Sequence, residues 1–305
     1  MQSSVVAVGM FDGVHIGHAA VLAAARREAS RRGAASVAYT FDVSPRAAIA
    51  GGPPALLLPP DARRSLLSRS ADRVVEGTFA HLRLLTPHEF VEREIVNRLA
   101  ASAVVVGYDF RFGHERRGVV ETLRGEATSH GVDVVVVDPV YVDGLPVSST
   151  RIRALVRAGA VEEARRLLGR PPVLLGTVVR GDGLGEQLGF PTANLDVSPA
   201  VLLPADGVYA AWAFAAPSPG ATASLVYIGS RPTLEDSPQR VEAHLLRRPV
   251  TDLRNRRLEV QLLTRIRGDR PFPSLEELRR AIAADVDAVA ANVDLFPPSE
   301  ALWVG

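Results

Sequence analysis

The chain of 305 residues contains no cysteine, which excludes a disulfide framework and any metal site built from thiolates. It also lacks an excess of one charge: 35 Lys and Arg residues stand against 34 Asp and Glu residues, so the chain as a whole has no field that attracts nucleic acid or an anionic membrane. No run approaches the roughly 18 apolar residues that a membrane span requires, and the first residues show no basic segment followed by an apolar core. We therefore expect a cytoplasmic protein that binds neither nucleic acid nor a membrane.

Apolar sequence is abundant, because 47% of the residues are hydrophobic, enough for two ordinary cores. In the first half, short apolar runs alternate with helical patterns, which predicts a doubly wound parallel sheet with ligands at the carboxyl ends of its strands. The expected strands are 5–8, 36–41, 73–77, 103–107 and 132–137, and the expected helices are 17–32, 61–70, 86–100 and 118–130, with another opening near 149. The Pro- and Gly-rich stretch 44–60 is expected to be a loop beside the strand ends.

The first strand-to-helix turn carries the most informative sequence, VVAVGMFDGVHIGH over residues 5–18. Its glycines let the backbone approach a ligand closely, and the unpaired N–H groups at a helix entrance favour anions such as phosphates. His15 and His18 add side-chain donors at that entrance. The turn therefore predicts a phosphate-binding site.

Two later loops follow other strands of the predicted sheet. GYDFRFG, residues 107–113, comes directly after one strand, and VSSTRIR, residues 147–153, opens a helix. Both are expected at the sheet edge where a nucleotide binds. By itself the second loop shows only ordinary helix-capping residues. The prediction of a nucleotide site therefore depends on the presence of all three motifs in this order.

The turn over residues 5–18 resembles the signature of the HxGH nucleotidyltransferase superfamily. The three motifs together resemble the adenylyltransferase module of the bacterial bifunctional riboflavin kinase/FAD synthetases, over about residues 4–170. This resemblance implies that FMN is adenylylated by ATP to give FAD and pyrophosphate, with His15 and His18 as catalytic residues. It also implies that a set of residues from the three motifs binds ATP: Gly9, Phe11, Asp12, Gly17, Asp109, Ser149, Thr150 and Arg153.

From residue 174 onward the pattern changes to short strands separated by Gly- and Pro-containing turns, which predicts a small antiparallel β-barrel. The expected strands are 174–179, 208–214, 223–228, 240–246 and 257–266. Ser274 with Glu277 predicts a capped helix whose apolar stripe packs on the barrel, namely Leu275, Leu278, Ile282, Val286 and Val289. The expected fold class is thus α/β followed by β: a Rossmann-like domain over 1–170, a barrel with a packing helix over 173–295, and a tail over 296–305 with Leu302 and Trp303 as docking residues.

The motifs of this second half resemble the riboflavin kinase module of the same family: GTVV at 176–179, GFPTAN at 189–194, GVY at 207–209, GSRPT at 229–233 and VEAH at 241–244. The resemblance implies ATP-dependent phosphorylation of riboflavin to FMN, with Glu242 as the catalytic base. It also implies ATP and flavin binding by Gly181, Gly183, Gly185, Gly189, Pro191, Thr192 and Asn194. Thr192 and Asn194 lie two residues apart, so an extended segment presents both oxygens on one face, where they are expected to hold Mg²⁺.

Some positions depart from the family pattern. Residues 41–45 lack a proline and a histidine of the family segment, while Leu184, Tyr227 and Arg254-Asn255 replace an arginine, an asparagine and a Tyr-Gly pair. Two alternatives therefore stand beside the bifunctional enzyme with its small-molecule partners ATP, riboflavin and FMN. One is a monofunctional FMN adenylyltransferase with a degenerate kinase domain, and the other is a non-catalytic paralogue that binds a flavin or a nucleotide.

Overall fold

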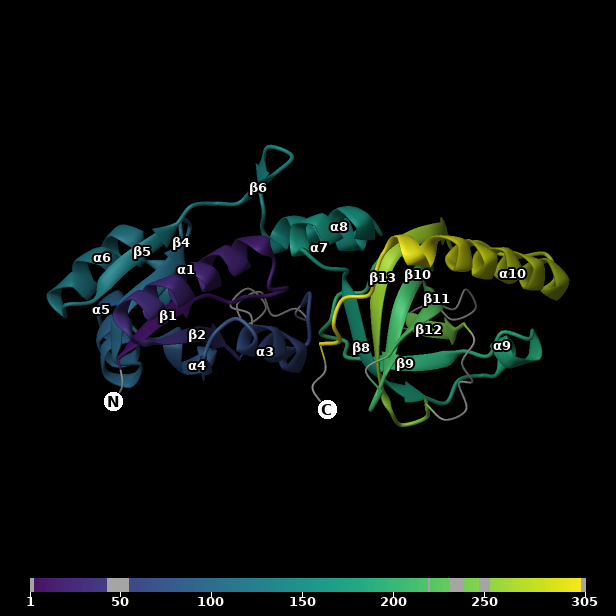
Figure 1. Cartoon of the computed structure of the whole chain (residues 1–305), viewed down its shortest axis with the longest axis horizontal. Coiled ribbons are helices and arrows are strands. Elements are labelled where there is room, and N and C mark those ends of the chain that lie inside the picture. Colours follow the sequence, from purple (N-terminus) through teal and green to yellow (C-terminus); the bar gives the residue numbers. More distant parts are fainter. Residues whose placement is uncertain (1–2, 43–54, 219, 231–238, 247–252, 303–305) are drawn as a thin grey trace. The chain divides into compact units, whose positions relative to one another are not determined.

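The computed structural model describes residues 3–42, 55–218, 220–230, 239–246 and 253–302 (Figure 1). The chain forms two compact units: Met1–Pro54 with Pro60–Ser148, and Ala55–Pro59 with Ser149–Gly305. Residues 43–54 of the expected loop and residues 231–233 of the GSRPT motif lie outside the described residues. Among the described residues, no helix is both long enough and apolar enough to cross a bilayer.

The first unit is built on a parallel five-stranded sheet with the order β3-β2-β1-β4-β5. Its strands are β1 (Ser4–Val8), β2 (Ala35–Phe41), β3 (Arg73–Gly77), β4 (Ala101–Gly107) and β5 (Asp133–Val137), which confirms the predicted strands. The strand order reverses between β1 and β4, and in doubly wound sheets ligands bind beyond the carboxyl ends of strands at such a point. The turn after β1 and the loop after β4 both leave the sheet at this edge.

Helices cover both faces of this sheet, because alternate strand residues point to opposite sides. Helix α1 (Ile16–Arg32) packs Leu22 and Ala25 against Val5 and Val105, and Gly33 ends it in the left-handed conformation, as predicted. The other face is covered by η1 (Phe90–Arg98) and α6 (Val120–Ser129). The remaining elements are α3 (Pro60–Ser68), α4 (Phe79–Leu82), α5 (Pro87–Glu89), η2 (His114–Arg116) and the hairpin β6 (Tyr141–Val142) with β7 (Leu145–Pro146).

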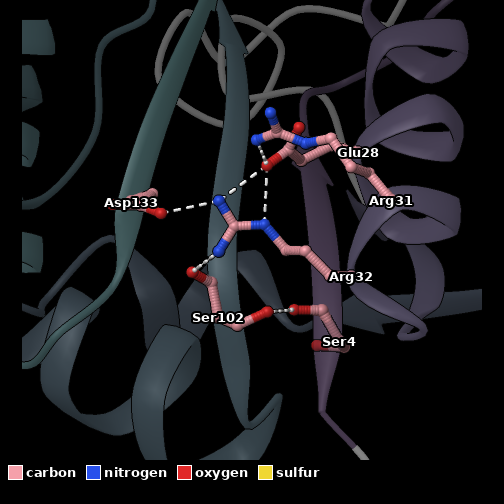
Figure 2. Close-up of polar contacts among 6 residues, drawn as sticks. All are labelled: Ser4, Glu28, Arg31, Arg32, Ser102 and Asp133. Atoms are coloured by element: carbon pink, nitrogen blue, oxygen red, sulfur yellow. Dashed lines mark hydrogen bonds and ion pairs between the residues drawn. The ribbon is translucent and has the colours of Figure 1, made fainter.

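An ion-pair network fastens the last turn of α1 to the amino-terminal edge of the sheet (Figure 2). Arg32 donates to Glu28 in its own helix at 2.6 Å, to Asp133 at the start of β5 at 2.6 Å, and to the Ser102 carbonyl of β4 at 3.1 Å. These contacts lie at the edge opposite the carboxyl ends of the strands. They attach the C-terminal end of α1 to the sheet and so help to fix the position of the whole helix, including its N-terminal end.

The second unit is a closed barrel with the order β10-β11-β12-β9-β8-β13. Its strands are β8 (Val173–Val179), β9 (Ala193–Val197), β10 (Gly207–Ala215), β11 (Ala221–Gly229), β12 (Arg240–Leu245) and β13 (Arg257–Gly268). The predicted barrel is confirmed, but β9 is an addition that the sequence pattern did not predict. Alternate residues of β12 are buried, with Val241, Ala243 and Leu245 in the barrel core, so Glu242 and His244 face outward.

The described part of this unit also contains α7 (Ser149–Arg157), α8 (Val161–Leu168), α9 (Leu184–Gln187), α10 (Leu275–Asn292) and η4 (Val293–Leu295). The stripe on α10 packs on the barrel through Ile282, Val286 and Val289, but Leu275 is 62% exposed, so its expected packing was wrong. Leu56 bridges to Val201: its N–H donates to the Ala200 carbonyl at 2.8 Å, and its carbonyl accepts from Leu202 at 2.8 Å.

The two compact units divide between Ser148 and Ser149, whereas the sequence placed the domain boundary at 170–173. The difference arises because α8 packs on β13 of the barrel. Val161 is fully buried in the barrel core, and the Thr264 hydroxyl donates to Glu162. The helices before residue 170 therefore contribute to the second core.

Candidate functional sites

The turn between β1 and α1 is held in an unusual backbone conformation. After Gly9 the chain passes through positive φ angles at Phe11 (51°), Gly13 (81°) and Val14 (39°). A positive φ is uncommon outside glycine, and for a β-branched residue such as Val14 it is an outlier. Such strain persists only where surrounding contacts impose it, and it is concentrated at catalytic and ligand-binding sites. The strained backbone therefore makes this turn a candidate functional site.

His15 is the N-cap residue of α1, and its ring contributes to the helix entrance. Its Nδ1 accepts a hydrogen bond from the His18 backbone N–H at 3.2 Å. An N–H donor needs a lone pair on Nδ1, so in this arrangement the neutral ring carries its proton on Nε2. That leaves Nε2–H as the donor that His15 can offer to an anion at the positive end of the α1 dipole.

The two imidazole rings stack on each other, with centroids 3.6 Å apart and planes 15° apart. Phe11 packs against His18 edge to face at 5.3 Å. Gly17 leaves room for this pair, because a Cβ there would lie 3.1 Å from Cε1 of His15, and a Cβ at Gly9 would lie 3.1 Å from the Phe11 ring. The structure thus brings six of the predicted residues together in one turn, and one of them, Asp12, is buried at 1% exposure.

Asp109 lies in the loop directly after β4, the strand that neighbours β1. Its side chain is exposed, and the flanking Phe110 and Phe112 rings stack at 5.5 Å, which anchors the loop to the sheet. The other predicted nucleotide ligands, Ser149 and Thr150, belong to α7 in the second compact unit. Arg153 of the same helix donates to the Ala55 carbonyl at 2.7 Å. Their contact with the nucleotide stays a prediction.

On the barrel, Thr192, Asn194 and Glu242 come together although two of them are far from the third in sequence. Asn194 of β9 pairs in register with Glu242 of β12, and the Thr192 hydroxyl donates to Oε2 of Glu242 at 3.1 Å. This bond turns the lone pairs of the Thr192 oxygen away from the carboxylate, where they can bind a cation. The three side chains form one polar group on the outer face of the barrel.

The Gly-rich segment after β8 lies against this group. A Cβ at Gly181 would overlap the Asn194 amide, and a Cβ at Gly185 would lie 2.5 Å from the Phe190 carbonyl and 3.1 Å from Oγ1 of Thr192. Gly183 and Gly189 take positive φ angles of 77° and 85°. Glycine at 181 and 185 therefore lets the backbone pass close to the polar group, whereas at 183 and 189 it provides the positive φ angles of the segment.

His244 is a residue of this site that the sequence reasoning named in a motif but gave no role. Its Nδ1 lies 2.8 Å from the Pro191 carbonyl, which can only accept, so Nδ1 carries the proton. Phe190 packs edge to face on the same ring at 5.7 Å. His244 thereby holds the segment that presents Thr192. The available signal was its position two residues after Glu242, which puts both on one face of a strand.

Comparison with known proteins identifies the family. A family model described as FAD synthetase matches residues 1–151, and one described as riboflavin kinase matches residues 168–293. A bifunctional riboflavin kinase/FMN adenylyltransferase of Pseudomonas fluorescens is 37% identical over 304 residues, covering 95% of this chain and 93% of its own. The protein of the same name from Escherichia coli (strain K12) is 33% identical over 290 residues, covering 93% and 91%. The chain belongs to the bifunctional riboflavin kinase/FMN adenylyltransferase family.

Similarity to a solved structure also extends over the whole chain. A Streptococcus pneumoniae protein described as a macrolide-efflux protein has a TM-score of 0.85 at 30% identity, covering 95% of this chain and 94% of its own. The FAD synthetase match ends at residue 151 and so includes Ser149 and Thr150, although α7 packs with the second unit. In this chain the matched region and the compact unit therefore end at different residues, 151 and 148.

Three of the departures from the family pattern lie in the second unit, whereas residues 43–45 of the other departure lie outside the described residues. Tyr227 of β11 pairs with Glu242 on the side opposite Asn194, and its hydroxyl donates to Asp269 at 3.2 Å. Burial, with Asp269 nearby, raises the pKa of Tyr227 well above its usual value, so this phenol is neutral at physiological pH. Leu184 is 46% exposed in α9, and Asn255 takes a positive φ of 62° in an exposed turn. None of these replacements breaks the contacts among Thr192, Asn194 and Glu242.

The donor set on the barrel fits magnesium bound together with a nucleotide. Thr192 offers a hydroxyl oxygen and Asn194 an amide oxygen, which are hard ligands without charge. Within the part of the chain that the structure describes, no cluster of three or more His, Cys, Asp or Glu residues could hold a metal on its own. Because Thr192 and Asn194 contribute no charge, a phosphate chain bound beside them would supply anionic ligands to a cation that they hold.

Proposed function

We propose that the chain makes FAD from riboflavin in two ATP-dependent steps, the first on the barrel and the second at the β1–α1 turn. The observation that carries the proposal is the contact of Thr192 with Glu242, in register with Asn194, because it keeps the kinase group assembled despite the nearby replacements. The stacked histidines supply the second site. The family to which the chain belongs supports both activities.

In the kinase step, the terminal hydroxyl oxygen of the ribityl chain attacks the γ-phosphorus of ATP. A bond forms between these two atoms, the bond from the γ-phosphorus to the bridging oxygen breaks, and ADP leaves. Glu242 takes the proton of the hydroxyl. Thr192 and Asn194 would hold Mg²⁺, which offsets charge on the phosphates when it is bound. The glycines from Gly181 to Gly189 let backbone N–H groups approach those phosphates.

In the adenylyltransferase step, a phosphate oxygen of FMN attacks the α-phosphorus of a second ATP. The bond to the oxygen that bridges the α- and β-phosphorus atoms breaks, and pyrophosphate leaves with that oxygen. His15 and His18 donate hydrogen bonds where negative charge develops, at the positive end of α1. Asp109, Ser149, Thr150 and Arg153 are proposed to complete nucleotide binding. We place both reactions in the cytoplasm, as the sequence suggested.

The test is to incubate the purified chain with riboflavin, ATP and Mg²⁺ and to separate riboflavin, FMN and FAD over time. FMN should appear first and FAD should follow. A parallel sample with FMN in place of riboflavin isolates the second step, and a sample with chelator should make neither product. FAD from supplied FMN but no FMN from riboflavin would favour the degenerate kinase, the alternative that Tyr227 beside Glu242 supports. Bound flavin without turnover would favour the non-catalytic paralogue.

A further inference from the structure

Arg63 of α3 is a buried cation for which neither the sequence motifs nor the proposed mechanism gives a role. The residue is 2% exposed. Its Nη1 donates to the Met10 carbonyl at 3.2 Å and its Nη2 donates to the Phe41 carbonyl at 2.8 Å. Within the described residues, its Nε is buried with no hydrogen-bond partner. Arginine is rarely buried, because the guanidinium loses its hydration and needs hydrogen-bond or ion-pair partners that compensate for that loss.

The two carbonyls mark the point at which neighbouring strands separate. β1 and β2 pair in register up to Val8 and Tyr39, and the last ladder bond runs from the Gly9 N–H to the Tyr39 carbonyl at 3.1 Å. Beyond it, β1 leaves the sheet for the turn that leads to the histidines. The planar guanidinium spans the gap with two N–H donors, so it continues the link between the strands after their own hydrogen bonds end.

Met10 is also the first residue of the strained turn. Its carbonyl accepts from the Thr40 hydroxyl at 3.1 Å as well as from Arg63. Phe11 and Val14, with φ of 51° and 39°, follow directly. Burial lowers the pKa of the Arg63 guanidinium, and the carboxylates of Glu76 and Asp12 oppose that change, which places the buried Asp12 of the turn within electrostatic range.

We propose that Arg63 is a positioning residue of the adenylyltransferase site, whose guanidinium fixes the base of the turn at Met10 and thereby the orientation of His15 and His18 toward the nucleotide. The inference rests on the proposed function of that turn. Arg63 acts through the backbone and does not itself touch the substrate. Its loss should therefore reduce the chemical step more than the affinity for ATP, because a small misplacement of a donor costs most in the transition state.

The test uses the full chain and three variants, Arg63→Met, Arg63→Lys and, as matched control, Arg64→Met. Arg64 is the next residue of α3, its side chain is 52% exposed, and it pairs with Glu76 at 2.7 Å. With FMN and ATP supplied, Arg63→Met should lower kcat for FAD formation at least about 10-fold with less than about a threefold change in KM for ATP. FMN formation from riboflavin, in the same samples, should stay within about twofold.

Arg63→Lys should give an intermediate kcat, because an ammonium keeps the charge but cannot reach both carbonyls in a planar fork. The chain contains no lysine, so this variant has a single side-chain ammonium whose ¹⁵N signal reports whether the buried cation is still charged. The imidazole ¹⁵N signals of His15 and His18 should shift in this variant. A purely structural role would leave them in place.

Two results would overturn the proposal: a fall in kcat no greater in Arg63→Met than in Arg64→Met, or unchanged imidazole signals of both histidines in Arg63→Lys. If Arg63→Met does not fold, the Lys variant decides by the same two measurements. If the unaltered chain makes no FAD, the proposed function of the turn fails, and the imidazole signals still decide whether Arg63 positions the histidines.

Discussion

Single residues at the two candidate sites differ in how far the sequence could place them. The three-residue spacing of His15 and His18 puts both in the first turn of a helix, so their proximity was predictable, although the stacking of their rings was not. Thr192 and Glu242 stand fifty residues apart, and only the pairing of β9 with β12 brings them into contact. No local pattern reports such a pairing, which is why His244 and its link to the Pro191 carbonyl had no predicted role.

Replacement of His18 by alanine should separate the two reactions. Loss of one donor aimed at developing charge typically costs about 2.7–4 kcal/mol, so FAD formation from FMN should fall about 100-fold or more. FMN formation from riboflavin should be unchanged, since it uses the barrel. His88→Ala is a suitable control, because that histidine is exposed and pairs with Glu126 at 2.8 Å. Near-normal adenylylation in the His18 variant would show that its role is misassigned.

Glu242→Gln addresses the kinase step. Glutamine keeps the shape and an oxygen that can accept from Thr192, but it cannot take the proton of the ribityl hydroxyl, so FMN formation should drop by roughly 100-fold or more. Conversion of supplied FMN to FAD should continue at its normal rate. Glu276→Gln, on the exposed face of α10, controls for a change of charge. An unchanged kinase rate in the Glu242 variant would rule out this residue as the base.

Among the helices and strands, sequence patterns predicted those features that depend on contacts between residues close together in the chain. The expected helix 86–100 begins where its sequence predicts, since Thr86 and Glu89 form a capping box with both of its hydrogen bonds present. The sequence predicts a helix to about residue 100 but not its type, and residues 90–98 form a π-helix in which Glu94 accepts from the Tyr39 hydroxyl at 2.6 Å. β9 escaped prediction because it is short and half polar, and it exists through its pairing with β8 and β12.

The C-terminal tail is held by a buried carboxylate on the barrel, and Leu302 docks as predicted, whereas Trp303 lies outside the described residues. Glu259 is fully buried and accepts from the Leu302 N–H at 2.6 Å and from Gln261 at 3.0 Å. Burial lowers the pKa of Arg170 to about 10, and the negative charge of Glu259 partly opposes this shift. Removing this carboxylate leaves the buried Leu302 N–H without its acceptor and takes away the negative charge that opposes the effect of burial on Arg170.

Glu259→Ala should therefore lower the free energy of unfolding by about 3 kcal/mol. Trp212 lies in β10 of the second unit, so its fluorescence during urea unfolding reports on that unit. Glu276→Ala, which loses only an exposed pair with Arg280, should change the midpoint little. Equal midpoints for the two variants would mean that the tail contributes no stability.

For the whole molecule, the two-domain organisation was predictable because the hydrophobic period changes along the chain. The position of the division was not, because the burial of Val161 and the contact of Glu162 with Thr264 are long-range. A fragment starting at Ser149 keeps α7 and α8, whereas one starting at Val173 exposes the apolar surface that α8 covers.

Of these two fragments, the one from residue 149 should be the more stable. Full burial of Val161 alone is worth about 1.5–3 kcal/mol, so the urea midpoint followed by tryptophan fluorescence should be clearly higher for 149–305 than for 173–305. The longer fragment should phosphorylate riboflavin and make no FAD. Equal urea midpoints for the two fragments would instead support a domain boundary at 170–173. A folded fragment without kinase activity would support the degenerate kinase.

The bridge between Leu56 and Val201 has a consequence for the order of events during synthesis. The ribosome makes the chain from its amino terminus, so all five strands of the first sheet emerge before Val201 exists. Until then the run Leu56–Leu58, at most 9% exposed in the finished protein, lacks the Ala200–Leu202 segment to which Leu56 is hydrogen-bonded. A nascent chain arrested between β5 and β9 should therefore expose a leucine-rich segment to chaperones, although its first sheet is complete.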